Sequence, residues 1–271
     1  MNLFLKKRLQ KKMIGASLLI GVVICMLQFY QVINNYLLYG MDASRIFSES
    51  PYTTWIGIDP FNFSPSLFFL LIPIIASVPT ATLLRQDINN RFIVQLKLRK
   101  SLKQVIWSYA IVAFISGFIV IAVPLLINFG SYFFILPNVK PDDMINSNLT
   151  IMNKNTLLVS LYYTHPFFHA LLAIIFASFW GGIFSLFTFA SSLFIKNKFV
   201  ALCSGLILQI ILLLVNSMLK LPKDISYAPF NFLKEMNNAN IDISTVLTVT
   251  IFMIAVCLAL IKWGGKRSIV K

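Results

Sequence analysis

The pattern in this chain that comes nearest to a catalytic or metal-binding motif is HPFFH, which contains His165 and His169. Two histidines four residues apart share one face of a helix, and imidazole is a common zinc ligand. The pattern lacks the glutamate of the HExxH zinc motif, and no third ligand is evident in the sequence. Pro166 also suits the first turn of a helix. We therefore interpret the pair as the start of a helix and expect no metal, with an intramembrane metalloenzyme as the least favoured alternative.

Nucleotide chemistry on this chain is also not expected. The sequence contains no GxxxxGK[ST] phosphate-binding loop, and the nearest fragment, GGKRS at residues 264–268, lacks the first glycine and follows no predicted strand. The three cysteines fall in apolar runs, where thiols usually behave as small buried hydrophobes: Cys25, Cys203 and Cys257. We expect no catalytic residue and no cofactor bound by this chain.

Composition identifies the chain as an integral membrane protein. Its 271 residues are 58% hydrophobic and 12% charged, with a mean hydropathy of +0.81, which leaves too little polar surface to coat a soluble globule. The net charge of +14 does not indicate nucleic-acid binding, because the basic residues are spread between apolar runs and do not form one basic domain. With no repeats or linkers, residues 1–271 are predicted to form a single transmembrane domain.

Six apolar runs are long enough to cross a membrane, since twenty helical residues cover about 30 Å. They comprise residues 13–38, 65–84, 105–127, 166–194, 199–219 and 243–263. The chain is therefore predicted to be an all-α protein with six transmembrane helices. The basic residues 1–12 are predicted to form a short interfacial helix before the first span. A secretory signal is the alternative, but the first apolar run exceeds the core of such a signal.

Charged residues predict the orientation of these spans. Residues 85–104, between spans two and three, hold six of the 23 Lys and Arg residues. Asp87 is the only one of the nine acidic residues on the same side of the membrane as this basic segment. Because Lys and Arg are retained on the cytoplasmic side, both chain termini are predicted to be cytoplasmic.

The segments predicted on the opposite side contain two apolar stretches. Residues 48–66 carry Trp55 and several other aromatic residues, which are predicted to lie at the headgroup boundary. The stretch YAPFNFLKEM, residues 227–236, is an apolar patch beside a proline and is predicted to dip back toward the membrane.

The basic segment 85–104 also contains the pattern of a short amphipathic helix. Asp87 can accept a backbone N–H at a helix N-terminus. Apolar residues then follow at four-residue spacing, at Ile88, Phe92 and Leu96. Residues 94–99 alternate apolar and polar, so an extended strand is the alternative there. The SLKQ sequence at residues 101–104 has capping-box spacing and predicts the start of the next span.

Span five carries the main strongly polar side chains of the membrane interior, Gln209 and Asn216. No Asp, Glu, Lys or Arg lies in the middle of a predicted span, which argues against a carrier driven by protons or sodium. The favoured interpretation of both amides is hydrogen bonding between helices, with substrate contact as the alternative. The small residues Ser204 and Gly205 would permit close helix approach nearby.

The sequence from residue 52 to about 111 resembles the permease subunit of bacterial ABC-2-type exporters. The resemblance rests on YTTWIGID, then LFFLLIPIIASVPTATLL as span two, then RQDINNRFIVQLKLRKSLKQVIWSYAI. It implies a subunit of an ATP-driven exporter in the bacterial plasma membrane, moving a hydrophobic or amphipathic substrate such as a peptide. ATP and Mg²⁺ would bind to a separate cytoplasmic ATPase.

The same resemblance assigns roles to individual residues. It implies a cytoplasmic coupling helix at residues 87–96 that docks on the ATPase, with contacts from Asp87, Asn90, Arg91, Phe92, Leu96 and Arg99. It implies a homo- or heterodimer of permease chains, surrounded by membrane lipids, with spans two and five at the substrate path and spans one and five meeting between subunits. The residues expected there are Pro73, Pro79, Ser204, Gly205, Gln209 and Asn216. A non-transporting membrane sensor or immunity protein for a peptide, built on the same fold, is the alternative.

Overall fold

The computed structural model describes residues 11–39, 49–59, 62–81, 83, 87, 90, 101–142, 155–195, 197–236 and 239–267. This part of the chain is helical and contains no strand, apart from one isolated bridge between Ile225 and Asn240. Within it, six helices are long and apolar enough to cross a membrane: α2 (Lys11–Tyr39), α5 (Phe63–Ala81), α8 (Leu102–Tyr132), α10 (Pro166–Ser192), α11 (Lys198–Met218) and α13 (Ile243–Arg267). The predicted all-α class and the six predicted spans are confirmed.

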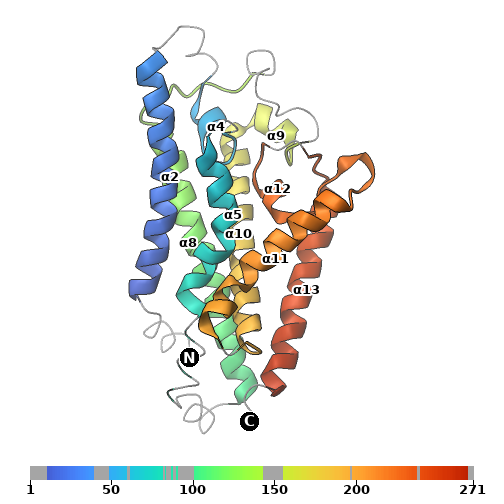
Figure 1. Cartoon of the computed structure of the whole chain (residues 1–271). Coiled ribbons are helices and arrows are strands. Elements are labelled where there is room, and N and C mark those ends of the chain that lie inside the picture. Colours follow the sequence, from blue (N-terminus) through green and yellow to red (C-terminus); the bar gives the residue numbers. More distant parts are fainter. Residues whose placement is uncertain are drawn as a thin grey trace.

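The six helices form a bundle with α5, α8 and α10 at its centre (Figure 1). The pair α8 and α10 forms the most extensive contact, and α5 packs against both. On the outside, α2 packs on α5 and α8, α11 packs on α5 and α10, and α13 packs mainly on α10. The start of α2 and the end of α13 lie at the same end of the bundle (Figure 1).

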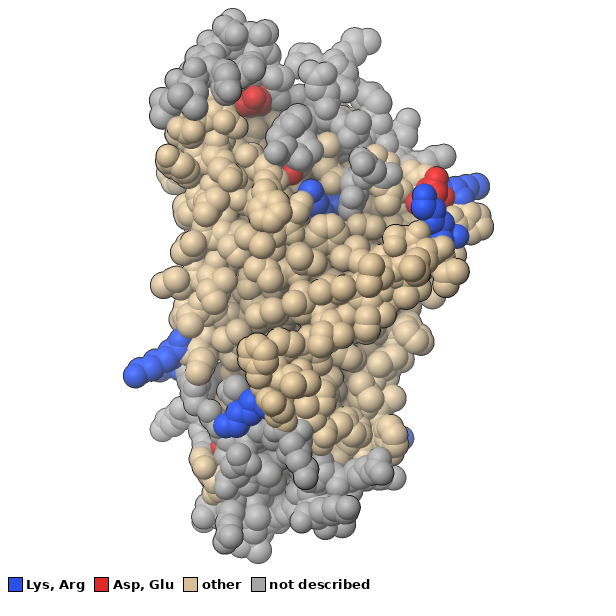
Figure 2. Space-filling model, in the orientation of Figure 1, with Lys and Arg blue, Asp and Glu red and all other residues tan. Residues whose placement is uncertain are grey.

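The two ends of this bundle differ in the charged side chains that they carry. On the face drawn in Figure 2, the described Lys, Arg, Asp and Glu residues leave an uncharged band between the ends. We call the end where α2 starts and α13 ends the basic end, and the opposite end the acidic end. Asp87 is the one described acid of the basic end, whereas the acidic end carries Glu49, Asp59, Asp142, Asp224, Glu235 and Asp242. An uncharged band crossed by six apolar helices is what a bilayer requires, so the chain is a multi-pass membrane protein.

The spacing of the central helices depends on glycine. A Cβ atom added at Gly117 of α8 would lie 2.6 Å from the Cβ of Ser185 and 2.8 Å from the carbonyl oxygen of Gly181, both in α10. Any side chain at Gly117 would therefore push the two helices apart. Small residues at such a contact let helix backbones approach closely in a membrane, where packing replaces the hydrophobic effect between helices.

Short elements cover the acidic end of the bundle: α4 (Pro51–Thr54), α9 (Val159–Thr164), the 3₁₀ helix η1 (Pro222–Asp224) and α12 (Pro229–Leu233). Trp55, which follows α4, is only 1% exposed, and its ring centroid lies 5.8 Å from that of Phe129 in α8. Aromatic packing thus draws this segment into the bundle, so the Trp55 ring is not exposed to lipid, and its predicted place at the headgroup boundary stays a prediction. The segment around α12 does turn back, and Phe232 is buried against α10.

Several predictions concern the basic end. Residues 1–10 of the predicted interfacial helix lie outside the described residues, and Lys11 and Lys12 already belong to α2. Of the predicted coupling helix, Asp87 is helical and Asn90 lies in a turn, while the remainder lies outside the described residues. Ser101 is the N-cap residue of α8, but its side chain makes no capping hydrogen bond, so the predicted capping box is not formed.

Candidate functional site

Asp87 connects the basic segment to the centre of the bundle. Its side chain is buried, and the hydroxyl of Tyr109 in α8 donates a hydrogen bond to the Asp87 carboxylate. The ring of Tyr109 in turn stacks on Phe189 of α10, with 6.4 Å between the ring centroids. Asn90 is exposed. The other residues predicted to contact an ATPase lie outside the described residues: Arg91, Phe92, Leu96 and Arg99.

Pro73 interrupts the backbone hydrogen bonding of α5, and α11 compensates for the interruption. A proline has no N–H, so the carbonyl of Phe69, four residues earlier, loses its donor within the helix. Gln209 of α11 is completely buried, and its Nε2 donates to this carbonyl at 3.0 Å. This is the hydrogen bond between helices that the sequence favoured for Gln209. Its Oε1 atom has no hydrogen-bond partner among the described residues.

Pro79 interrupts α5 a second time, and here α2 compensates. The carbonyl of Ile75 loses its donor within the helix because Pro79 lacks an N–H. The hydroxyl of Ser17 in α2 donates to the Ile75 carbonyl. Both proline interruptions of α5 are therefore satisfied by side chains from its neighbours, as a helix in lipid requires.

Gly205 lies where α5, α10 and α11 meet. A Cβ added at Gly205 would lie 3.2 Å from the Cβ of Pro73 and 3.2 Å from Oγ1 of Thr188 in α10. Ser77 of α5 joins the same contact, with its Oγ 2.9 Å from Oγ1 of Thr188 and 2.5 Å from the carbonyl oxygen of Pro73. The structure thus brings Pro73, Gly205 and Gln209 together within one chain. Their predicted roles in a substrate path or dimer contact stay predictions.

Ser204 and Asn216 have separate surroundings. The Ser204 hydroxyl donates within α11 to the Ala201 carbonyl at 2.7 Å. Near the acidic end, Oδ1 of Asn216 accepts from the backbone N–H of Tyr227 at 3.0 Å and from the Ser226 hydroxyl at 3.3 Å, which holds the chain leading into α12 against α11. Asn216 also lines an open pocket of about 320 Å³ together with Ser217, Lys220, Asp224, Ile225, Asn231 and Ala239.

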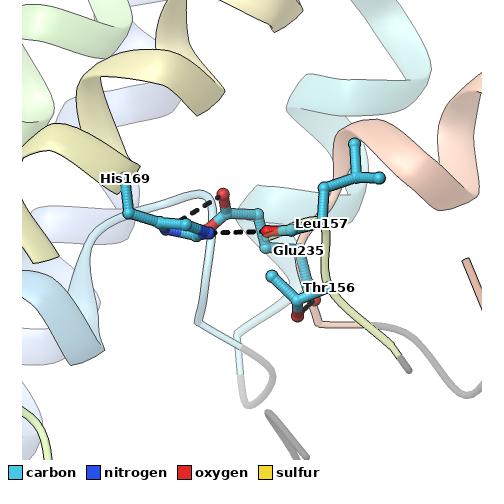
Figure 3. A network of polar contacts seen from close by, with 4 residues as sticks. All are labelled: Thr156, Leu157, His169 and Glu235. Atoms are coloured by element: carbon cyan, nitrogen blue, oxygen red, sulfur yellow. Dashed lines mark hydrogen bonds and ion pairs between the residues drawn. The ribbon is translucent and has the colours of Figure 1, made fainter. Parts of the chain in front are cut away.

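A buried acid–base pair at the acidic end is a feature that sequence reasoning missed. Nδ1 of His169, in the first turns of α10, lies 3.7 Å from Oε1 of Glu235, which follows α12 (Figure 3). Their side chains are 3% and 9% exposed. Nε2 of His169 lies 2.8 Å from the Leu157 carbonyl oxygen, and the Thr156 hydroxyl donates to the Glu235 backbone carbonyl at 2.5 Å. The available signal was the single acid in the apolar stretch YAPFNFLKEM.

The two histidines of HPFFH are not equivalent in the structure. His169 is buried beside Glu235, whereas His165 is exposed and its ring centroid lies 6.3 Å from that of Phe168. Among the residues that the structure describes, no three His, Cys, Asp or Glu side chains form a group that could hold a metal ion. The chemistry that this arrangement offers is proton exchange between one carboxyl and one imidazole.

Burial determines the electrostatics of Glu235. It raises the pKa of this carboxyl from 4.5 to about 7, while the nearby His169 opposes part of the rise. Tyr162 of α9 lies beside the pair, with its ring centroid 5.4 Å from that of His169, and burial raises the pKa of its hydroxyl. Lys234 turns away, since its Nζ donates to the Ser66 hydroxyl at 3.0 Å.

A second buried acid at this end, Asp59, has a contrasting environment. Its carboxylate accepts from Gln28 Nε2 at 2.7 Å, from Asn62 Nδ2 at 2.7 Å and from the Asn62 backbone N–H at 3.2 Å. Oε1 of Gln28 in turn accepts from Asn128 Nδ2 at 2.9 Å and from the Tyr132 hydroxyl at 2.7 Å. This network joins α2 and α8 to the segment that follows α4.

Comparison with known proteins adds no family assignment. No model of a known protein family matches this chain, and no curated protein or solved structure is significantly similar to it. The function therefore has to be inferred from the residues of the chain itself and from their arrangement.

Proposed function

We propose that this chain is the transmembrane subunit of an ATP-driven exporter that works with a separate cytoplasmic ATPase. The observation that best supports this proposal is the way in which α5 is interrupted by prolines and held by its neighbours. This helix leads directly into the basic segment 85–104, and its two proline interruptions are held by side chains from α2 and α11. In the proposed orientation, the basic end and both termini face the cytoplasm of a bacterial cell.

The proposed mechanism is transmission of movement through α5. A force applied to residues 85–104 acts on two central helices at once, because α5 precedes this segment and α8 follows it. Asp87 adds a direct connection to α8 through Tyr109. At Pro73 and Pro79, α5 can bend without breaking a backbone hydrogen bond of its own. Closure of the ATPase would then shift the bundle between two arrangements.

The remaining roles follow from this proposal. ATP and Mg²⁺ bind to the partner ATPase, which docks on the segment that starts at Asp87, with contacts from Asn90, Arg91, Phe92, Leu96 and Arg99. The buried Asp87 carboxylate itself holds this segment to Tyr109. A second permease chain, identical or different, completes the transporter in the lipid bilayer. The substrate is hydrophobic or amphipathic, with a peptide as one example. The exposed apolar side chains of α11, which include Phe199, Leu214 and Met218, are available to lipid or to the second chain.

Affinity purification of the tagged chain from its native cells in mild detergent tests the proposal. We expect an ATPase subunit to co-purify and the complex to hydrolyse ATP. Phe92→Ala should reduce recovery of the ATPase, since removal of an aromatic anchor from a partner pocket typically costs about 2 kcal/mol or more. Phe134→Ala is the matched control, because Phe134 is 91% exposed at the acidic end and should have no effect on recovery.

Two outcomes would contradict the proposal. Full recovery of the ATPase with Phe92→Ala would argue against residues 87–96 as the docking element. Purification of the intact chain without any ATPase activity would instead favour a sensor or immunity protein.

A further inference from the structure

The hydrogen bonds of His169 define which ring nitrogen carries a proton. Its Nε2 lies 2.8 Å from the carbonyl oxygen of Leu157, and a carbonyl can only accept a hydrogen bond. Nε2 must therefore carry an N–H. In a neutral imidazole the other nitrogen, Nδ1, then has a lone pair and no proton. This nitrogen is the one that faces Glu235 at 3.7 Å (Figure 3).

A proton is needed between these two side chains. If Glu235 were ionised and His169 neutral, two acceptors would face each other in a buried site. Neither Nδ1 of His169 nor Oε2 of Glu235 has a hydrogen-bond partner among the described residues. Because burial favours the neutral acid, the arrangement that resolves the conflict is a protonated Glu235 whose O–H is directed toward Nδ1, which lies 3.7 Å from Oε1. We infer that His169 and Glu235 form a proton-binding site, and that the bound proton holds residues 229–236 against α10.

Glu235 is positioned to control how the acidic end is closed. We call residues 229–236 the α12 segment; α12 itself packs on α5, α10 and α11. The ring centroid of Phe232 lies 5.3 Å from that of Trp180 in α10. The backbone of Glu235 also donates to the Gly57 carbonyl at 3.0 Å and accepts from the Thr156 hydroxyl. Loss of the proton would thus loosen a junction between α10, α12 and the segments beside α4 and α9.

The other titratable groups near the pair do not replace His169. Tyr162 faces it from α9, and burial raises the pKa of its hydroxyl, so that it stays neutral at physiological pH. Lys234 precedes Glu235, but its Nζ donates to Ser66, and Asp59 is the acid that acts on it electrostatically. No described Lys or Arg forms an ion pair with Glu235.

The direction of the pH dependence follows from Glu235. Burial raises its pKa from 4.5 to about 7. A group with a raised pKa in the folded state contributes stability that is fully present below its ordinary pKa and is lost as the pH rises through the folded value. The α12 segment should therefore be docked in mildly acidic medium and should loosen as the pH rises past about 7.

Hydrogen–deuterium exchange of the full chain in lipid nanodiscs tests this inference. After correction for the intrinsic rate, the α12 segment of the wild type should exchange about tenfold faster at about pH 8 than at about pH 6. Glu235→Gln should remain protected at both pH values, because the glutamine amide can always donate to Nδ1. His165→Gln is the matched control: it changes the exposed histidine and should keep the wild-type pH dependence.

Infrared difference spectra between the same two pH values provide a second measurement. The wild type should lose a carboxylic acid carbonyl band at the higher pH, and Glu235→Gln should lack this band. Equal protection of the wild-type segment at both pH values would overturn the inference, even if no variant folds. An unchanged pH dependence in folded Glu235→Gln would also overturn it. Neither measurement involves an ATPase, so failure here is distinguishable from failure of the proposed function.

Discussion

Asp59 and Glu235 are both buried acids at the acidic end of the bundle, yet their surroundings differ. Three N–H groups from Gln28 and Asn62 donate to the Asp59 carboxylate at 2.7 to 3.2 Å. Glu235 instead has one imidazole nitrogen 3.7 Å from Oε1, and its Oε2 has no partner among the described residues. Donors stabilise a buried carboxylate, whereas burial without donors favours the neutral acid. The Asp59 site is therefore suited to a permanent structural role, whereas the Glu235 site is suited to a change of protonation.

Lys234 shows that proximity in the chain does not decide which acid is stabilised. It precedes Glu235, but its electrostatic interaction is with Asp59, and burial lowers the pKa of its ammonium group. Its Nζ also donates to Ser66 of α5. The positive charge nearest to Glu235 in sequence is thus directed away from it, which leaves His169 as its partner.

The largest effect is expected from Asp59→Asn. An asparagine presents an N–H where the network needs an acceptor, so one donor from Gln28 or Asn62 would lose its partner. We expect destabilisation by about 3 kcal/mol, measured as unfolding of the purified chain during titration with SDS. Asp224→Asn is the control, because Asp224 is 69% exposed and its ion pair with Lys220 should contribute less than about 1 kcal/mol. Equal losses in the two variants would remove the distinction between a buried network and a surface charge.

Glu235→Gln should act in the opposite direction to Asp59→Asn. The rise of the Glu235 pKa from 4.5 to about 7 means that the ionised carboxyl destabilises the fold above neutral pH. The variant removes this cost, so we expect stabilisation by about 2 kcal/mol at about pH 8 and a smaller change at about pH 5. The same SDS titration at the two pH values measures the difference. Destabilisation at both would show that Glu235, like Asp59, is needed as a charged group.

A smaller effect is expected at Gln209, which combines a satisfied Nε2 with an Oε1 that has no described partner. Gln209→Leu should cost about 1 kcal/mol, because the Phe69 carbonyl loses its donor. In a Pro73→Ala background the cost should shrink, since the introduced alanine would supply a backbone N–H to that carbonyl. A double-mutant cycle in SDS unfolding measures this coupling. Strictly additive effects would show that Pro73 and Gln209 do not act on the same carbonyl.

The spans could be predicted from the sequence because hydropathy and length are properties of each segment alone. The bounds agree to within a few residues, with the largest extension in α8, which continues to Tyr132 and not only to residue 127. The proline interruptions of α5 could also be predicted, since each proline identifies the carbonyl that it leaves without a donor. The donors could not be paired with them, because Ser17 and Gln209 belong to distant parts of the chain.

The acidic end was less predictable because its burial depends on contacts between segments. Trp55 looked like a residue of the membrane boundary by composition, and only its packing on Phe129 explains its burial. No sequence pattern connects His169 with Glu235, because His169 lies in the first turns of α10 and Glu235 follows the short α12, far along the chain. The predicted coupling residues beyond Asp87 and Asn90 stay a prediction from the resemblance to exporter permeases.

The proline interruptions of α5 also have a consequence for biogenesis. Helices enter the membrane in chain order, so α2 and Ser17 are already present when α5 is inserted, and the Ile75 carbonyl can be satisfied at once. The Phe69 carbonyl must wait until α11 brings Gln209. Until then, α5 carries an unsatisfied polar group, which is costly in lipid. A chain truncated before α11 would therefore keep an unsatisfied carbonyl in α5. By this feature, membrane quality control can distinguish it from the finished protein.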